Sequence, residues 1–461
     1  MLSLADAILQ EDFAAVQNLI HQGDDVNQLD EYGFTPLIEA AIANNIEISK
    51  FLLRAGADVN LTDATGGSAL HWAAENNNLD LTKILLKAGA NPNHFNYAGQ
   101  SILVMPMLRR QKTLRQLLIK AGADPIFAQD YINTKLIGHL FELVGISTIV
   151  SPANQFVEVD FEGFYLEVTL GVIAESLHQF QNHFAARQLR RYSGLAQFIV
   201  EVLHNALRLS HYQHYRIEVE EYDAEINKLL AEEPLLLPIG YEGHAITFVR
   251  YGDIWVKCDR REDSRLYDNI VFYRMTRLEK LTPTFIKKLL YTKQSDRYIN
   301  EKLDQDLGLV PLTELKVEAQ ISGNCSWANV EAAIPIIFFL MLMQANKDQQ
   351  ATAYYKTLAL NFFHRWREWN KDRMLDFCIQ SYHEGDVLRK ASKAEILAAI
   401  LFQSCDYQRP ADRSRIDQVL KILVGSPYEY LIKNYLRVYY SESRTEDGMR
   451  FAAMLKEYGY L

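Results

Sequence analysis

The chain has 461 residues, of which 49% are hydrophobic and 23% are charged. These proportions are near the average for globular proteins and exclude wholesale disorder. The 48 Lys and Arg against 58 Asp and Glu give a formal net charge of −10, so general binding to a nucleic-acid backbone is disfavoured. Four cysteines are too few for a disulfide scaffold and fit a reducing compartment, where a single thiol can serve chemistry.

The N-terminus and the longest apolar run bear on targeting. The first residues, Met-Leu-Ser-Leu-Ala-Asp, reach Asp6 without a basic segment, so we expect no secretory signal peptide. The longest apolar run, Ala332 to Met343, has twelve residues, whereas a membrane-spanning helix needs about 20. We therefore expect this run to form a buried helix.

A period of 33 residues runs through the N-terminal part. Four glycines lie at this spacing: Gly23, Gly56, Gly89 and Gly122. A second series has the same period: Gly33, Gly66 and Gly99. Glycine accepts the left-handed conformation with which many helices end. Asn44 and Asn77 stand where the first helix of a pair must stop, and Asn tolerates that conformation better than most residues. The period therefore predicts a series of helix pairs.

These repeats resemble the ankyrin repeat, with about four helix pairs over residues 1–130. The fourth repeat departs from the pattern because Pro106 replaces a small helix residue. We expect this repeat to be distorted or to form a junction with the rest of the chain.

The ankyrin resemblance implies a protein partner bound at the hairpin tips and the concave helix face. The candidate contact residues are Tyr32, Phe34, Thr65, Trp72, Tyr97 and Gln100. Exposed aromatic residues are common interface anchors, but Phe34 and Trp72 fit equally well as filling between repeats. Residues 1–130 carry 9 Lys and Arg and 15 Asp and Glu, a net charge of −6. This favours a partner with a basic face, although solubility explains the acidity equally well.

After Gly145 the period is lost. Residues 156–169 alternate as in a strand, and residues 172–209 have the spacing of two helices. Residues 243–259 predict two strands joined by the turn Tyr251-Gly-Asp. In such a hairpin His244 on the first strand and Asp259 on the second can face each other. A carboxylate beside an imidazole fixes its tautomer and stabilises its cation.

Cys325 lies in the segment Gly-Asn-Cys-Ser-Trp, directly before a long apolar stretch. A helix N-terminus and an adjacent imidazolium both lower the pKa of a thiol and supply thiolate at neutral pH. Gln320, a few residues upstream, can donate to an oxyanion together with the Cys325 backbone N–H. If the helix starts at Cys325, Pro335 falls inside it and predicts a kink near Glu331.

The order His244, Asp259, Gln320, Cys325 resembles that of the clan of ubiquitin-like-protein proteases, over residues 241–325. The His-Ala dipeptide and the nearby Trp327 are more similar to papain-type proteases. The resemblance implies a Cys-His-Asp thiol hydrolase of peptide or isopeptide bonds, or less commonly an acyltransferase, acting on a ubiquitin-like or peptide substrate. In it Cys325 is the nucleophile, His244 its acid–base partner, Asp259 orients His244, and Gln320 assists the oxyanion.

A second interpretation is an inert protease-like scaffold that acts only through protein–protein interaction. Taken singly, a cysteine before an apolar helix is more often a small buried hydrophobe. The sequence also departs from the clan in two places. Ala245 follows the histidine where the clan usually has Trp, and Gln320 lies one residue closer to Cys325 than is typical. Since the sequence has no His/Cys cluster at metal spacing, no P-loop and no Rossmann fingerprint, we expect no cofactor or metal.

The chain from residue 346 onward has helical spacing throughout. The predicted fold is therefore multidomain. Its parts are an all-α ankyrin solenoid at 1–130, an α+β cysteine-protease-like domain at 140–345 and a helical C-terminal region at 346–461.

This combination resembles the ankyrin effectors that Legionella bacteria inject into host cells by a type IV secretion system. The acidic tail with Glu442, Glu446 and Asp447 is similar to the glutamate-rich signal of such substrates, although a solvated charge run is the ordinary interpretation. The resemblance implies a host protein partner and a location in the host cytoplasm or nucleus.

Overall fold

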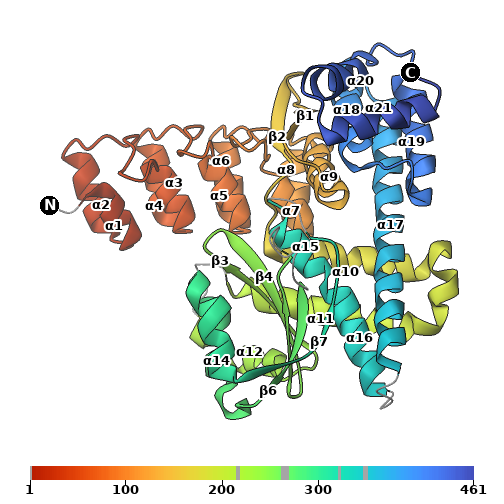
Figure 1. Ribbon diagram of the computed structural model, residues 1–461. Coiled ribbons are helices and arrows are strands. Elements are labelled where there is room, and N and C mark those ends of the chain that lie inside the picture. Colours follow the sequence, from red (N-terminus) through yellow and green to blue (C-terminus); the bar gives the residue numbers. More distant parts are fainter. Residues whose placement is uncertain (1–2, 214–218, 261–268, 320–322, 346–350) are drawn as a thin grey trace. The chain divides into compact units, whose positions relative to one another are not determined.

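The computed structural model describes residues 3–213, 219–260, 269–319, 323–345 and 351–461 (Figure 1). The chain forms two compact units. The first, here called the ankyrin unit, comprises residues 1–135, 146–160 and 381–396. The second, here called the thiol unit, comprises residues 136–145, 161–380 and 397–461.

The ankyrin unit begins with four antiparallel helix pairs, drawn in red and orange in Figure 1. Their helices are α1 Leu4–Leu9, α2 Phe13–His21, α3 Pro36–Ile42, α4 Ile46–Arg54, α5 Ala69–Glu75, α6 Leu79–Lys87, α7 Val104–Leu108 and α8 Lys112–Lys120. The predicted stop residues have left-handed backbones, with φ of 55° at Asn44, 53° at Asn77 and 97° at Gly56. The predicted ankyrin array is therefore confirmed.

The fourth repeat is distorted, as its sequence predicts. Helix α7 has five residues, against seven in α3 and α5. It contains Pro106, and its N-cap Leu103 has a helical backbone, whereas the caps Thr35 and Ser68 are extended. Proline removes a backbone donor from the helix, which accounts for the shortened element.

A small hairpin, β1 Ile146–Val150 and β2 Phe156–Asp160, completes this unit together with part of α9 Pro125–Phe141 and of α18 Val387–Ala399. The hairpin lies against the last ankyrin tip, because a Cβ added to Gly99 would come within 2.9 Å of the Glu158 carbonyl oxygen. Helix α18 is tied to α9 by buried Asp130, which pairs with Arg389 at 2.9 Å and with Lys393 at 3.1 Å.

One prediction in this region is wrong. The strand expected over 156–169 ends at Asp160, and residues from Leu166 belong to helix α10 Leu166–Asn182. Gly163, with φ of 68°, interrupts the extended backbone between them. Residues 164–169 alternate in polarity over too short a stretch to distinguish a strand from the first turn of a helix.

The thiol unit is built on a five-stranded antiparallel sheet in the order β3-β4-β5-β6-β7. The strands are β3 Leu235–Tyr241, β4 His244–Tyr251, β5 Ile254–Cys258, β6 Ile270–Met275 and β7 Leu309–Leu315. Strands β4 and β5 are the hairpin predicted from residues 243–259, with Tyr251 opposite Ile254. That prediction is confirmed.

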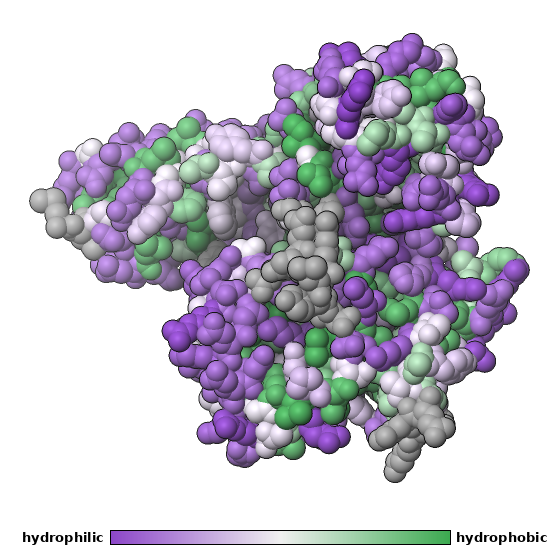
Figure 2. Space-filling view, in the orientation of Figure 1, coloured by the Kyte–Doolittle hydropathy of each residue, from purple (hydrophilic) through white to green (hydrophobic). Residues whose placement is uncertain are grey.

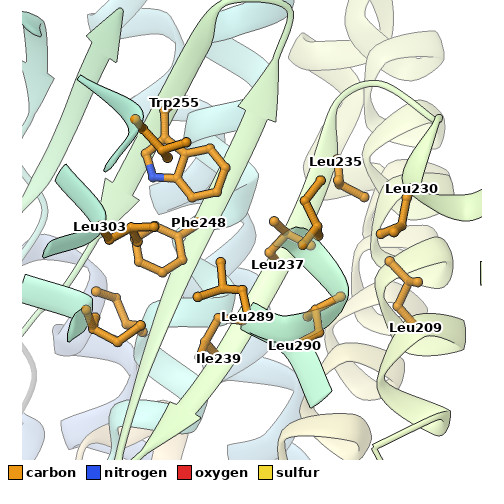
Figure 3. Packing of buried hydrophobic residues seen from close by; sticks show 14 of the residues in the cluster. Leu209, Leu230, Leu235, Leu237, Ile239, Phe248, Trp255, Leu289, Leu290 and Leu303 are labelled. Carbon is orange, nitrogen blue, oxygen red and sulfur yellow. The ribbon is translucent and has the colours of Figure 1, made fainter. Parts of the chain in front are cut away.

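One face of the sheet is covered by a cluster of buried apolar residues (Figure 3). Phe248 of β4 and Trp255 of β5 meet there with ring centroids 5.2 Å apart. Four helices supply the other side of the cluster: α11 Ser193–His211, α12 Asp223–Leu230, α13 Pro283–Tyr291 and α14 Leu303–Leu307. Because side chains alternate along a strand, the neighbouring residues of β4 and β5 point to the opposite face.

The opposite face packs against α15 Cys325–Glu331 and α16 Ala333–Ala345. In one such contact the rings of Phe339 on α16 and Phe272 on β6 have centroids 5.1 Å apart. The helix breaks at Ala332, close to the kink that Pro335 predicts. By length and composition Cys325–Ala345 would suffice to cross a membrane, but 78% of its apolar window is buried inside the protein. The prediction of a buried helix is confirmed.

The remaining elements are helical, which confirms the predicted C-terminal region. Helix α17 Thr352–Glu384 packs on α10, where the Trp366 indole N–H donates to the Ser176 hydroxyl at 3.1 Å. Within the described ranges the other helices are η1 Phe184–Tyr192, η2 Val219–Tyr222, η4 Leu278–Lys280, η5 Tyr298–Lys302, η7 Ile400–Ser404, α19 Pro410–Leu423, α20 Tyr430–Tyr435, η8 Leu436–Glu442 and α21 Glu446–Glu457.

Candidate thiol site

His244 is held at the start of β4 by a tight turn. Glu242 and Gly243 connect β3 to β4 with φ of 42° and 79°, and Tyr241 pairs with His244 across the turn. Positive φ at both central residues is typical of the two-residue hairpins that match strand twist. The Tyr241 ring lies edge-on to the imidazole, with centroids 5.5 Å apart, so the turn and this contact fix the ring.

Asp259 follows the last residue of β5 and meets His244. Its Oδ1 lies 2.9 Å from Nε2 of His244. The side chain of His244 is 17% exposed and that of Asp259 is 13% exposed. This hydrogen bond occupies Nε2, and the Cys325 thiol lies near enough to the imidazole to help raise the His244 pKa. The structure therefore brings together the three residues of the predicted triad.

Cys325 is the first residue of α15 and is partly exposed. The backbone N–H groups of Ala245 and Ser326 and the His244 side chain lie near enough to its sulfur to lower the pKa of the thiol. Because Cys325 begins the helix, its own backbone N–H has no acceptor within the helix. The sulfur thus lies among several donors that favour a negative charge.

The pKa values of the pair shift in opposite directions. Burial raises the pKa of the Cys325 thiol, but the His244 hydrogen bond and charge and the two backbone donors outweigh burial and lower it. Burial likewise disfavours the His244 cation, yet hydrogen bonds to Asp259 and Cys325 raise its pKa to about 9. At neutral pH these shifts favour a thiolate–imidazolium pair.

The other three cysteines lie in different surroundings. Cys258, Cys378 and Cys405 are buried. Burial raises the pKa of Cys258, and burial together with Asp412 raises that of Cys405 to about 12. Burial outweighs the nearby cations, Arg260 at Cys258 and Arg415 at Cys405. A buried thiol that stays protonated is inert, so Cys325 is distinguished by its surroundings.

The residue before Cys325 is anchored by a histidine that the sequence did not reveal. His139 of α9 lies with Nδ1 2.7 Å from the side-chain oxygen of Asn324, and Asn324 donates back to the His139 carbonyl at 3.3 Å. The His139 ring stacks on Trp327 at 5.8 Å. Since 185 residues separate His139 from Asn324, no local pattern pointed to this contact.

Asn329 is a second residue that sequence reasoning missed. It is fully buried one helical turn after Cys325, and its side-chain amide contacts the backbone beside His244 and beside Asp259. The signal for it is a polar residue within the apolar segment Trp327-Ala-Asn-Val. Arg260, next to Asp259, is also fully buried and pairs with Glu331 of α15 at 2.8 Å.

Gln320, the predicted oxyanion residue, lies outside the described residues. Among the residues that the structure does describe, no group of three or more His, Cys, Asp or Glu side chains is arranged to hold a metal ion.

The predicted partner-binding residues fall into three groups. Tyr32 and Tyr97 project from the hairpin tips with 69% and 79% of their surface exposed. Thr65 is exposed, and its hydroxyl donates to Asp63 at 2.6 Å. Phe34 and Trp72 contact each other across neighbouring repeats with centroids 6.2 Å apart and are only partly exposed, so both help to fill the repeat interface.

Gln100 corrects the prediction, because it is buried and offers no contact surface. It directly follows Gly99, against which strand β2 lies. Elsewhere on the face drawn in Figure 2, hydrophilic side chains of the ankyrin helices alternate with small groups of hydrophobic ones.

Comparisons with known proteins agree with this architecture. A family model described as ankyrin repeats, in three copies, matches residues 4–96 and 55–126. The solved structure of the Legionella effector AnkH is 40% identical in sequence, with a TM-score of 0.85, over 100% of this chain and 98% of that chain. No curated protein matches the sequence.

Proposed function

The chain belongs to the family of the Legionella effector AnkH, and on that basis we propose that it is a bacterial effector translocated into host cells. Its ankyrin repeats bind a host protein. Its thiol unit carries out Cys325-dependent hydrolysis of a peptide or isopeptide bond.

The observation that carries the enzymatic part is the contact chain from Asp259 through His244 to Cys325. The Cys325 thiolate attacks the substrate carbonyl carbon. The tetrahedral oxyanion then accepts hydrogen bonds from the backbone N–H of Cys325 and from the side chain of Gln320. His244 gives its proton to the leaving amine, which leaves a thioester on Cys325. His244 then removes a proton from water, and hydroxide attack releases the acid and restores the thiolate.

The binding part depends on the exposed tips. Tyr32 and Tyr97 supply large, amphipathic contact surfaces that protrude from the array. The net charge of −6 over residues 1–130 favours a host protein whose contacting face is basic, because opposite charge speeds encounter and selects against acidic partners.

An inert scaffold is the second candidate function. The observation that favours it is Ala245, which stands where the clan of ubiquitin-like-protein proteases usually has Trp. In this alternative the thiol unit keeps its fold and its contacts with Cys325 but only binds a partner.

The two candidates separate when the full chain is treated with ubiquitin-like and peptide probes that carry an electrophile. We expect labelling of the wild type, loss of labelling in Cys325→Ala, and strong reduction in His244→Ala, which keeps the thiol but removes its cation. Cys378→Ala serves as a matched control and should label like the wild type. Absence of labelling from every wild-type sample would favour the scaffold.

The binding part is tested separately by replacing both protruding tyrosines. Tyr32→Ala combined with Tyr97→Ala should abolish capture of a host protein from infected-cell lysate while the probe reaction of Cys325 continues. Tyr440→Ala removes a tyrosine that is 45% exposed outside the ankyrin unit and should leave capture unchanged. Equal capture by all three proteins would remove the tips from the interface.

A further inference from the structure

We propose that Asn329 is the positioning residue of the thiol site, in that its side-chain amide holds the strand ends bearing His244 and Asp259 against the helix that begins at Cys325. The inference rests on the proposed thiol chemistry of Cys325 and explains how three residues from separate elements keep one geometry.

The amide of Asn329 makes contacts in two directions. Its nitrogen donates to the carbonyl oxygen of Ala245 at 2.6 Å. Its oxygen accepts from the backbone N–H of Arg260 at 2.9 Å and from the Cys258 thiol at 3.7 Å. Ala245 directly follows His244, and Arg260 directly follows Asp259. One side chain therefore hydrogen-bonds the backbone of both strands, in each case at the residue next to His244 or Asp259.

The strand register shows what the amide replaces. Strands β4 and β5 pair from Tyr251 opposite Ile254 as far as Thr247 opposite Cys258. Two more steps at the same register would place Ala245 opposite Arg260. In an antiparallel ladder such residues bond directly through backbone N–H and C=O groups. Here the Asn329 amide lies between the Arg260 N–H and the Ala245 carbonyl and hydrogen-bonds both, so a side chain extends the strand pairing where the direct backbone bonds end.

The same residue is linked to the nucleophile. Asn329 follows Cys325 by four positions on α15, so both lie on one face of the helix. Asn329 donates to the carbonyl of Ala245, and the N–H of Ala245 lies near enough to the Cys325 sulfur to lower the pKa of the thiol. Movement of the amide would therefore displace a donor to the sulfur and change the distance between Cys325 and His244.

The chemistry of the side chain matches this role. Only a residue with both a donor and an acceptor can satisfy a carbonyl and an N–H at once, and Asn and Gln are the neutral side chains with a planar amide. Asn329 is fully buried between the apolar residues Ala328 and Val330. A buried amide costs free energy unless its partners are in place, so its bonds hold the strand ends firmly.

The test measures how the alkylation of Cys325 by iodoacetamide depends on pH in the full chain, with the Cys325 peptide quantified by mass spectrometry. Because the thiolate is the reacting form, the midpoint of this profile reports the thiol pKa without a substrate. We expect Asn329→Leu, which is similar in volume but cannot hydrogen-bond, to raise the midpoint by about one pH unit and to slow alkylation about tenfold at pH values well below the wild-type midpoint.

A matched control separates positioning from stability. Val330→Ala empties space at the neighbouring buried position without touching the strand ends, so it should lower the melting temperature but leave the alkylation midpoint in place. If Asn329→Leu does not fold, Asn329→Ser replaces it, since Ser is small and polar but too short to reach both strands.

The outcomes distinguish this inference from the proposed function. A wild-type midpoint at the ordinary thiol value of about 8.5 would overturn the proposed thiolate pair itself. A lowered wild-type midpoint that Asn329→Leu leaves unchanged would overturn only the role of Asn329. Failure of both Asn329 variants to fold while Val330→Ala folds would also overturn it, because Asn329 would then serve stability alone.

Discussion

The two units fix their side chains over different ranges of sequence. In the ankyrin unit one contact recurs from repeat to repeat. The side-chain oxygens of Asn27, Asn60 and Asn93 accept the backbone N–H found 31 residues later, at 2.8, 2.9 and 2.8 Å. In the thiol unit the contacts are not repeated. Asn329 and Arg260 each form several hydrogen bonds, and these join residues that lie 68 to 84 positions apart in the sequence.

The difference predicts different responses to substitution. A repeated contact joins only neighbouring repeats, so its loss should stay local and graded. A buried residue that several elements share cannot be lost without leaving other buried groups unsatisfied. The three predictions below probe this contrast, beginning with the largest effect.

Arg260→Met should destabilise the thiol unit most. The guanidinium is fully buried, donates to the carbonyl of Ala328 at 3.0 Å and pairs with Glu331 at 2.8 Å. Removing it leaves a buried carboxylate with less compensation, which costs about 3–5 kcal/mol. Urea denaturation measures the change in unfolding free energy.

The control for Arg260 is an exposed arginine on the same sheet. Arg274 is 59% exposed and pairs with Asp253 at 3.4 Å, so Arg274→Met should cost no more than about 1 kcal/mol. Equal losses from the two substitutions would contradict the claim that the buried contact network carries the stability of this unit.

The same contrast explains how far the sequence predicts the structure. The ankyrin array follows from signals spaced by 33 residues, and the β4–β5 hairpin follows from local alternation around one turn. The pairing of His244 with Asp259 was predictable because that hairpin brings them together. Placing Cys325 beside them required resemblance to known proteases, since Cys325 lies 81 positions after His244.

Contacts made between distant segments were not predictable. The Asn324–His139 bond joins residues 185 positions apart, and Asn329 reads as an ordinary polar interruption of an apolar helix. Gln100 looks like a tip residue in the repeat pattern, yet it is buried next to Gly99, against which strand β2 lies, and the period does not include that strand. Burial of this kind depends on what packs against a residue from elsewhere in the chain.

Glu39→Gln should stabilise the ankyrin unit above neutral pH. Glu39 is 5% exposed. Burial raises its pKa from 4.5 to about 7, and Asp30 contributes through a hydrogen bond and through its negative charge. Between these two values the folded state holds a proton that the unfolded state has released, so stability falls as pH rises through this window. Gln cannot ionise and can still donate to Asp30.

The gain from Glu39→Gln should be on the order of 2 kcal/mol at pH 8 and should vanish below about pH 4.5. Urea denaturation at several pH values measures it as the difference between variant and wild type. Glu31→Gln, at an exposed position next to Asp30 in the turn before α3, controls for the loss of any acidic charge. A gain that is the same at every pH would show that the buried carboxyl is not its source.

Asn60→Ala should have the smallest effect of the three. Asn60 accepts from the Asn91 N–H at 2.9 Å and donates to the Gly89 carbonyl at 3.2 Å, and each such bond contributes about 0.5–1.5 kcal/mol. We expect a loss of about 1–2 kcal/mol, confined in hydrogen exchange to the junction between the second and third repeats. Asn18→Ala, at an exposed position of α2, should change stability by less than about 0.5 kcal/mol.

Asn93→Ala removes the equivalent contacts one repeat later, where the side chain accepts from the Asp124 N–H at 2.8 Å and donates to the Gly122 carbonyl at 2.8 Å. In an array of independent neighbour contacts the two single losses add in the double variant. A double loss well above their sum would mean that the repeats behave as one cooperative block. The array would then resemble the thiol unit, with stability that depends on groups far apart in the chain.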